Sequence, residues 1–368
     1  VLVEAVSNYE QKEINGLSHF LEHMCFKGTE RRPTALDISS ELDSLGAQYN
    51  AFTSNEYTGY YAKVQPADFD KALDIVSDLY LNPTFKAEEV EKEKGVIIEE
   101  INMYEDLPQR RVQELIPELL YGDQPAGWGV AGKKEVIRIL RREDFIAYRA
   151  KHYVASATII VVAGNFDETT VHEKIAKHFV NIPVTEKHGK VKTTEIQTEP
   201  KTLLQYKESD QTHLVLALRA YDAFHPDHYI LEVIASILGG GMSSRLFQKV
   251  REEMGAAYYV NAANESLTDH GYFSASAGAD NAKAAEVVGA IVGEMKRLRD
   301  EVVGEKELQM VKDMIVGNLF LSLETSDHVA TFLGGQEVLK RKILTPEEIT
   351  EKIRSVTATD ISRVARDI

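Results

Sequence analysis

Residues 16–28 read Gly-Leu-Ser-His-Phe-Leu-Glu-His-Met-Cys-Phe-Lys-Gly. Three of them, His19, Glu22 and His23, stand in the order H-x-x-E-H, the reverse of the metal-binding H-E-x-x-H signature. On a helix, residues four apart lie one turn above each other on the same face, so both imidazoles can reach one metal ion. Glu22 projects on the same side, next to any water that the ion holds. The alternative is a pair of surface histidines on an amphipathic helix.

A catalytic zinc ion usually takes three protein ligands, so a third ligand must come from elsewhere in the chain. Residues 87–101 read Ala-Glu-Glu-Val-Glu-Lys-Glu-Lys-Gly-Val-Ile-Ile-Glu-Glu-Ile. The spacing predicts a helix with one stripe that holds Val90, Glu93, Ile97 and Glu100. Carboxylates aligned with apolar residues need a partner, because an unpaired buried charge is costly. Glu93 and Glu100 are therefore candidates, and the alternative is a solvated helix with i,i+4 ion pairs.

These residues resemble the pitrilysin/insulinase family of inverted-motif zinc endopeptidases. In this sequence 76 residues separate His23 from Glu100, which matches the family's pattern of an H-x-x-E-H motif followed by a glutamate. The resemblance implies that His19, His23 and Glu100 bind one Zn²⁺. It also implies that Glu22 is the general base and that Glu93 orients a ligand from outside the ligand shell. The surrounding phrases are similar to the catalytic subunit of mitochondrial processing peptidase and its small bacterial relatives.

Length and composition fit a globular protein with more than one domain. The chain has 368 residues, of which 43% are hydrophobic and 27% charged. The single cysteine, Cys25, excludes an internal disulfide framework and suits a reducing compartment, so we expect a cytoplasmic protein of bacterial type. We interpret Cys25 as a small buried helix residue rather than a ligand or nucleophile. No apolar run approaches the ~20 residues of a membrane-spanning helix.

The charge balance argues against several classes of partner. Lys and Arg number 42 and Asp and Glu number 58, which gives a formal net charge of −16. Nucleic acids and anionic membranes are therefore poor partners. An acidic surface would attract basic peptides, but solubility explains the same charge equally well. A chain of this size is also compatible with a homodimer.

An internal repeat indicates two domains of one architecture. Residues 38–53 and 246–261 each read as an amphipathic helix, a Gly-Ala turn and a strand. We predict an α+β protein with two similar domains, each a mainly antiparallel sheet with helices on one face. The predicted ranges are 1–182 for the metal-binding half, 183–200 for a polar linker, and 201–368 for the second half. The resemblance implies that the halves face each other as a clamshell.

The sequence also predicts the approximate bounds of one helix and several strands. We expect a helix near 168–179 and strands in five segments: 1–6, 57–64, 153–164, 213–220 and 271–276. The chain begins without Met inside a predicted strand. In the family that it resembles, relatives usually carry a further strand before this point and more sequence after Ile368.

The second half contains no metal-binding motif, because His228 at the corresponding position lacks a second histidine at the right spacing. It does contain Arg251 and Tyr258, seven residues apart. These two resemble the Arg/Tyr pair with which the family's C-terminal half holds substrate beside the zinc ion. A guanidinium and a phenol can donate to a substrate carbonyl and to the oxyanion that develops there. The alternative is an exposed helix Arg and an ordinary strand Tyr.

Asn50, Ala51 and Phe52 resemble the family's edge strand, onto which an extended peptide adds as another strand. The alternative is an ordinary strand with Phe52 in the core. A second motif is discounted: residues 127–132 match G-x-G-x-x-G but follow a loop rather than a strand, so nucleotide binding is not expected.

Together these features predict a zinc endopeptidase that hydrolyses extended peptides or unfolded, presequence-like segments bound between its halves. The competing class is a non-catalytic homologue that serves as a scaffold or regulatory subunit. The presence of all three ligands and of the base favours the enzyme. Cobalt or manganese would also satisfy these ligands.

Overall fold

The computed structural model describes all 368 residues as two compact units that interleave along the chain. Unit 1 consists of three segments, 1–104, 121–194 and 325–343. Unit 2 consists of 105–120, 195–324 and 344–368. Each predicted domain was one continuous range, whereas each unit consists of three segments, and two helices account for most of the difference. Most of helix α5 (Pro108–Tyr121) belongs to unit 2, and helix α12 (Ser326–Lys340) belongs to unit 1.

Helix α12 joins unit 1 through contacts that no local pattern in the sequence reveals. It packs on strands β1 (Leu2–Val3) and β4 (Thr158–Ile159). A Cβ atom on Gly334 would lie 2.7 Å from the Leu2 side chain, so the helix sits against this strand without space for a larger residue. Asp327 at its first turn accepts a hydrogen bond from Lys63 Nζ at 2.6 Å.

Unit 1 contains a four-stranded antiparallel sheet in the order β2-β3-β1-β4, with β2 (Gln48–Thr53) at one edge and β3 (Thr58–Lys63) next to it. The strands predicted over 1–6 and 153–164 are wrong in length, since only Leu2–Val3 and Thr158–Ile159 pair. The first ends early because the chain turns at Ala5, whose N–H donates to the Val3 carbonyl. The second begins late because a 3₁₀ turn occupies Ala155–Ala157.

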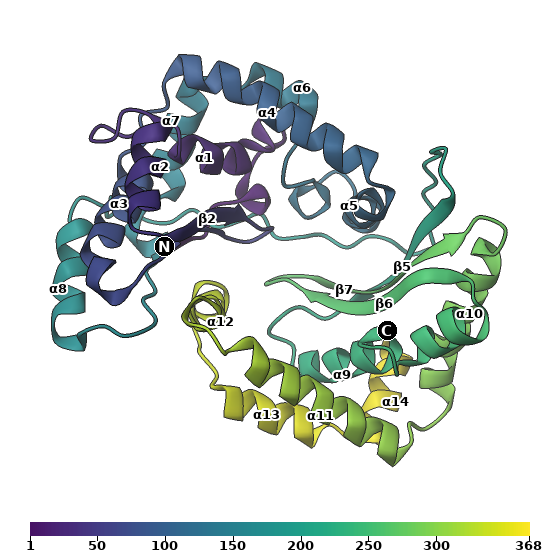
Figure 1. Ribbon diagram of the computed structural model, residues 1–368. Helices are drawn as coiled ribbons and strands as arrows, with labels where there is room; N and C mark the ends of the chain where they lie inside the picture. The colour runs from purple at the N-terminus through teal and green to yellow at the C-terminus, as the bar shows by residue number, and fades with distance from the viewer. The chain divides into compact units, whose positions relative to one another are not determined.

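Helices cover this sheet and enclose the core of unit 1. They are α1 (Leu17–Cys25), α2 (Ala35–Ser44), α3 (Phe69–Leu81), α4 (Ala87–Asp106), α6 (Lys134–Ile139), α7 (Arg142–His152), α8 (Glu168–His178) and α12. Helix α1 lies between β2 and α4 (Figure 1). Its residues Leu17, Phe20, Leu21 and Met24 follow the helical repeat and are fully buried. Cys25 is a buried free thiol, as predicted.

A buried ion-pair network fixes the loop after α1 against α2 and α3. The Arg32 guanidinium donates to Asp78 Oδ2 at 2.8 Å, to Asp74 Oδ2 at 2.7 Å and to Glu41 Oε2 at 2.8 Å. The Asp78 side chain is completely buried. Burial alone would raise the pKa of Asp78, but hydrogen bonds from Thr29 and its other neighbours lower it below the usual value.

Unit 2 is built on a three-stranded antiparallel sheet in the order β5-β7-β6. Its strands are β5 (Gln211–Ala220), β6 (Ala257–Ser266) and β7 (Gly271–Asp280). Five helices of this unit are α9 (His228–Gly239), α10 (Ala284–Asp300), α11 (Glu305–Ser322), α13 (Pro346–Ser355) and α14 (Ala358–Asp367). Figure 1 shows these helices on one face of the sheet, where fully buried alanines of β7 allow close packing. Both units are therefore α+β layers, as predicted.

The internal repeat is visible in the structure. In unit 1, α2 leads through Gly46 and an alanine into the edge strand β2. In unit 2, the segment Phe247–Glu253 leads through Gly255 and an alanine into the edge strand β6. Both glycines have positive φ, 61° and 54°, which glycine adopts without strain. The segment of unit 2 is a π-helix, whereas the sequence predicted an ordinary amphipathic helix.

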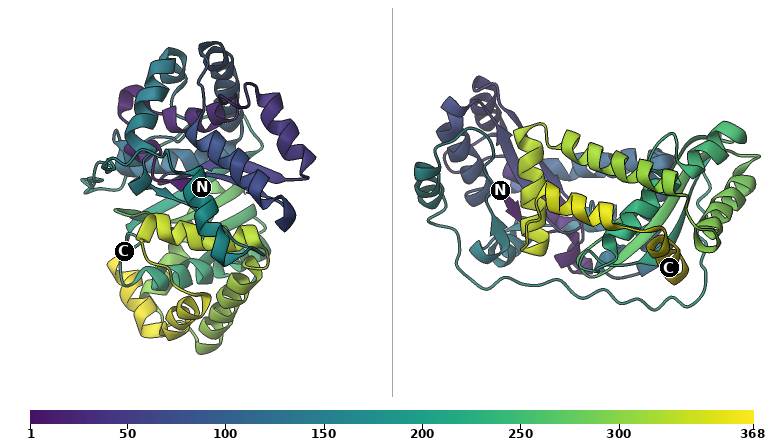
Figure 2. Two further views of the ribbon diagram at one scale, coloured as in Figure 1. Left: turned by 90° about the vertical axis from the view of Figure 1, so that its left-hand side faces the viewer. Right: turned by 90° about the horizontal axis from the view of Figure 1, so that it is seen from below.

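The predicted linker 183–200 contains no helix or strand, and the irregular stretch continues to residue 210 (Figure 2, right). The predicted helix near 168–179 is α8. How the halves face each other stays a prediction.

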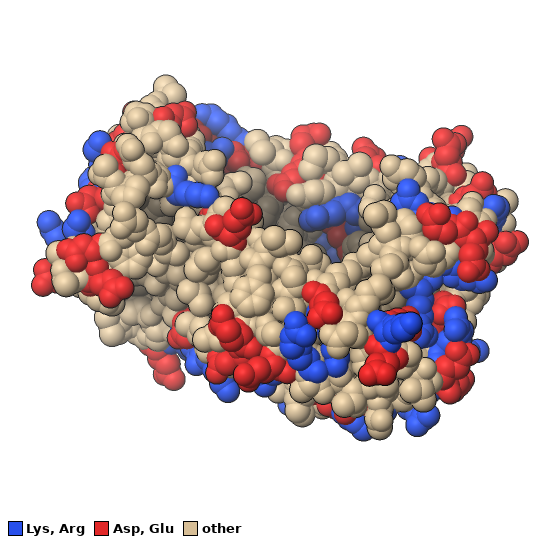
Figure 3. Space-filling model, turned by 60° about the horizontal axis from the view of Figure 1, so that its bottom comes forward, with Lys and Arg blue, Asp and Glu red and all other residues tan.

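No helix combines the length and the apolar character needed to cross a bilayer. On the face drawn in Figure 3, acidic and basic side chains are intermixed rather than gathered by sign.

Candidate metal centre

The helix that carries the H-x-x-E-H motif is fixed at its first turn by a buried carboxylate. Gly16 precedes α1 with φ 97°, and a Cβ atom there would lie 2.6 Å from the Ala131 carbonyl oxygen, so only glycine fits. The Glu10 side chain accepts the backbone N–H groups of Gly16 at 2.8 Å and Ser18 at 2.6 Å. These groups have no partner within the helix, and a negative charge at a helix N-terminus is favourable. Glu10 was not predicted from the sequence.

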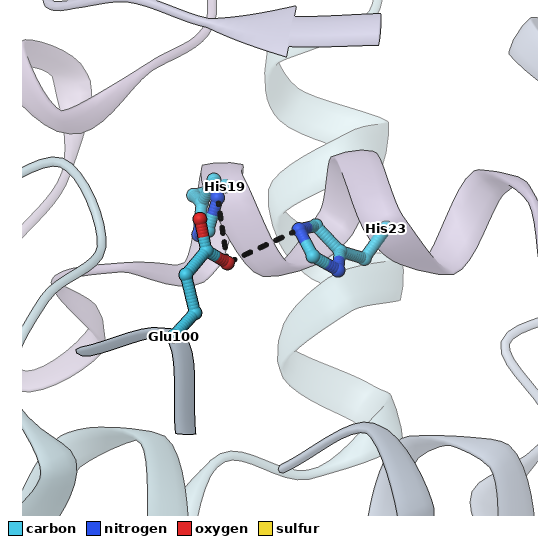
Figure 4. A group of neighbouring side chains, drawn as sticks. All are labelled: His19, His23 and Glu100. Atoms are coloured by element: carbon cyan, nitrogen blue, oxygen red, sulfur yellow. Dashed lines mark ion pairs between the residues drawn. The ribbon is translucent and has the colours of Figure 1, made fainter. Parts of the chain in front are cut away.

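His19, His23 and Glu100 converge although 76 residues separate the second histidine from the glutamate. Their candidate ligand atoms all lie within 4.8 Å of one another, and Figure 4 shows both imidazoles directed toward one carboxylate. The Nε2 atoms of His19 and His23 each lie 3.7 Å from Glu100 Oε2. This is the only such group of His, Cys, Asp or Glu side chains in the structure.

The spacing of these atoms fits a metal ion better than direct hydrogen bonds. A separation of 3.7 Å is too long for an N–H···O hydrogen bond. Ligand atoms bound tetrahedrally to zinc at about 2.0–2.1 Å would lie about 3.3 Å from each other. The two N···O separations would therefore close by about 0.4 Å around an ion, and the widest separation in the group, up to 4.8 Å, by up to about 1.5 Å. Two imidazole nitrogens and one carboxylate oxygen also form a common donor set for catalytic zinc.

Two further side chains contact the candidate ligands. Glu93 Oε1 lies 3.0 Å from His23 Nδ1, which leaves Nε2 of the same ring for the metal. Glu93 also forms an ion pair with Lys27 at 2.6 Å. Burial opposes its charge, but the hydrogen bonds from His23 and Lys27 lower the pKa of Glu93. The Tyr104 hydroxyl donates to Glu100 Oε1 at 2.8 Å and leaves Oε2 facing the imidazoles.

Glu93 was predicted from the sequence as an orienting residue, whereas Lys27 and Tyr104 were not predicted. For Tyr104 the available signal was the helical repeat, because it follows Glu100 by four residues on α4. Residues at this spacing are neighbours on one helix face. Lys27 lies beyond the end of α1 and contacts Glu93 of α4, so no local pattern indicated it.

The protonation states of the site suit metal binding and proton transfer. Burial, followed by the charge of His23, lowers the pKa of His19 to about 4, so this imidazole is neutral near pH 7. Glu22 is 9% exposed, and its burial raises the pKa of the carboxyl. A carboxylate whose pKa is raised toward neutrality is a better proton acceptor and donor in this range. Thr53 Oγ1 lies 2.6 Å from Glu22 Oε2.

The predicted peptide-binding residues Asn50, Ala51 and Phe52 lie in the middle of β2, which is an edge strand as expected. Ala51 packs against the core of unit 1. The Phe52 ring packs edge-on against Tyr57, with 5.6 Å between the ring centroids. Their role in peptide binding stays a prediction.

In unit 2 the structure brings Arg251 and Tyr258 together. The Arg251 guanidinium lies 4.9 Å from the Phe247 ring centroid and 5.6 Å from that of Tyr258. Arg251 belongs to the π-helix, a rare conformation that is frequent at functional sites. Tyr258 is 73% exposed. His228, the first residue of α9, lies with its Nδ1 atom 3.1 Å from Ser266 Oγ of β6, and it belongs to no metal-binding group. The substrate contacts of Arg251 and Tyr258 stay a prediction.

Comparisons with known proteins agree with this site. Residues 1–134 match the family model described as insulinase (peptidase family M16), and residues 140–315 match the one described as the peptidase M16 inactive domain. The description of the second match agrees with a unit 2 that lacks a metal-binding group.

Relatives extend over nearly the whole chain. The "uncharacterized zinc protease YmxG" of Bacillus subtilis is 35% identical over 362 residues, covering 98% of this chain and 88% of the relative. An "uncharacterized zinc protease" of Rickettsia bellii is 33% identical over 369 residues, covering 100% and 88%. The crystal structure of a protease from Helicobacter pylori superposes with a TM-score of 0.91 at 23% identity, covering 100% and 89%. The chain therefore belongs to the insulinase family of peptidases, family M16.

Proposed function

We propose that this protein is a zinc-dependent endopeptidase that hydrolyses peptide bonds in extended peptides. The observation that carries the proposal is the convergence of His19, His23 and Glu100, whose candidate ligand atoms lie within 4.8 Å of one another. The buried carboxylate of Glu22 lies on the same helix as the two histidines. Relatives that carry the name zinc protease support the choice of metal and of reaction class.

Each residue of the proposed site has its own role in the reaction. The Nε2 atoms of His19 and His23 and the Oε2 atom of Glu100 would hold the zinc ion, which when bound supplies Lewis-acid activation of a water molecule and of the scissile carbonyl. Glu22 accepts the proton of the attacking water and returns it to the leaving amine. Glu93 keeps the His23 ring in the orientation and tautomer that leave Nε2 available.

The proposed substrate is an extended peptide, basic in character or unfolded like a presequence. Its backbone would pair with the free edge of β2, where hydrogen bonds give affinity that tolerates many sequences. Asn50, Ala51 and Phe52 would provide the contacts along this edge. Arg251 and Tyr258 would donate to the substrate carbonyl and to the developing oxyanion.

A quenched-peptide cleavage assay on the zinc-loaded protein tests the proposal. We expect turnover that chelation removes, and a fall in kcat of about 10²–10⁴-fold in Glu22→Gln with zinc binding retained. Glu91→Gln is the matched control, because this side chain on α4 is 68% exposed and its ion pair is with Lys94 rather than with a group of the metal centre. Absence of cleavage by the zinc-loaded protein across a peptide library would favour the scaffold alternative instead.

A further inference from the structure

The general base proposed above is held by a side chain that belongs to the neighbouring sheet. Thr53 is the last residue of β2, and its Oγ1 atom lies 2.6 Å from Glu22 Oε2. An ionised carboxylate only accepts hydrogen bonds, so the threonine hydroxyl is the donor. This is the only hydrogen bond that the Glu22 side chain makes within the protein.

We propose that Thr53 is a positioning residue for Glu22, an inference that rests on the proposed peptidase function. By holding Oε2, the Thr53 hydroxyl fixes the rotation of the carboxylate and leaves Oε1 as the oxygen that meets the attacking water. A base oriented in this way needs no rearrangement before proton transfer, which lowers the entropic part of the barrier.

The hydroxyl of Thr53 is itself held in place. Thr53 pairs with Thr58 of β3 in the antiparallel ladder, and Thr58 is completely buried. Thr58 Oγ1 donates to the Ala5 carbonyl at 2.9 Å and lies 3.4 Å from Thr53 Oγ1. The β-branched side chain of Thr53 also has a restricted χ1 angle. The donor that orients Glu22 therefore sits on a rigid strand rather than on a loop.

This arrangement connects the proposed peptide-binding strand to the base. A peptide that paired with the free edge of β2 would lie along the same strand whose last side chain holds Glu22. One rigid strand would therefore place both the substrate backbone and the base.

A pair of opposite substitutions separates this role from a structural one. Thr53→Val keeps the shape and the strand preference but removes the hydroxyl, whereas Thr53→Ser keeps the hydroxyl and removes the methyl group. We expect Thr53→Val to lower kcat by about 10–100-fold with KM and zinc content close to wild type. We expect Thr53→Ser to stay within about threefold of wild type, because it retains the donor. A purely structural role predicts the reverse order, since valine favours strands.

The inference is overturned if Thr53→Val turns over like wild type, or if Thr53→Ser loses as much kcat as Thr53→Val. A crystal structure of zinc-loaded Thr53→Val gives a second readout that does not depend on turnover. We expect the Glu22 carboxylate to rotate or to occupy more than one position, and an unchanged single orientation would refute the role of Thr53. A wild-type protein that cleaves no peptide would remove the proposed function, while this crystal structure would still decide whether Thr53 orients Glu22.

Discussion

Glu93 offers a sharp test of the proposed metal centre, because it would act on zinc only through His23. Its side chain is 6% exposed and bridges His23 Nδ1 at 3.0 Å and Lys27 Nζ at 2.6 Å. Glu93→Gln keeps an acceptor for the His23 N–H but removes the charge that balances Lys27. Glu93→Ala removes both the acceptor and the charge. The two substitutions therefore remove the support of His23 in two steps, first the charge alone and then the charge together with the hydrogen-bond acceptor.

The expected magnitude follows from this graded loss. Removing the partner that orients a metal-binding histidine typically weakens metal affinity by about 10–100-fold. In free energy this is about 1.4–2.7 kcal/mol. We expect Glu93→Gln near the lower value, because the hydrogen bond to His23 survives, and Glu93→Ala near the upper value.

Zinc affinity measured by competition with a chromophoric chelator at neutral pH provides the assay. Glu91→Gln on the same helix is the control, because it removes an equal charge at an exposed position. Thermal unfolding of the metal-free variants shows whether folding has changed. The reasoning is refuted if Glu93→Ala binds zinc as tightly as the control, or if Glu93→Gln loses more affinity than Glu93→Ala.

Three further outcomes are expected. Zinc at a free concentration 100-fold above its Kd should stabilise the fold by about 2.7 kcal/mol, and a melting temperature that does not respond to added zinc would contradict the site. Tyr104→Phe should weaken zinc binding about tenfold, because Glu100 loses the hydroxyl that orients it; equal affinity in the chelator competition would remove Tyr104 from this role. Asp78→Asn should lower the free energy of unfolding by about 3 kcal/mol at neutral pH, because it breaks a buried pair with Arg32. The folded-state pKa of Asp78 lies below its unfolded value, so this stabilisation is present above about pH 4 and is lost as the pH falls through the folded pKa. Urea unfolding at neutral and acidic pH should therefore show a difference between wild type and variant that shrinks on acidification, and a constant difference would contradict this assignment.

The residues of the site that follow a helical repeat could be predicted from the sequence. His19 and His23 share a face because they are four residues apart, and the spacing to Glu100 carried the resemblance to a family. Contacts between segments far apart in the chain could not be predicted from it. Thr53 reaches Glu22 across the gap between a strand and a helix, and no local pattern marks either residue as the partner of the other.

The same distinction applies to the fold. The helix-turn-strand repeat was found because each copy is continuous in sequence, and both copies end in edge strands. The strands over 1–6 and 153–164 were predicted too long, because β-forming composition does not show how many residues find a partner. The return of α12 to unit 1 depends on packing against β1, a contact between segments more than 300 residues apart.

The buried carboxylate of Glu10 bears on how the protein would take up the proposed metal. Because it already accepts two backbone N–H groups at the start of α1, this end of the helix is held by the protein's own side chain and does not rely on an ion to nucleate it. In small zinc fingers, by contrast, metal uptake and folding are one event. Loading should therefore resemble the filling of a preformed chelate, with little change in circular dichroism or heat capacity, and the protein should survive repeated cycles of demetallation intact.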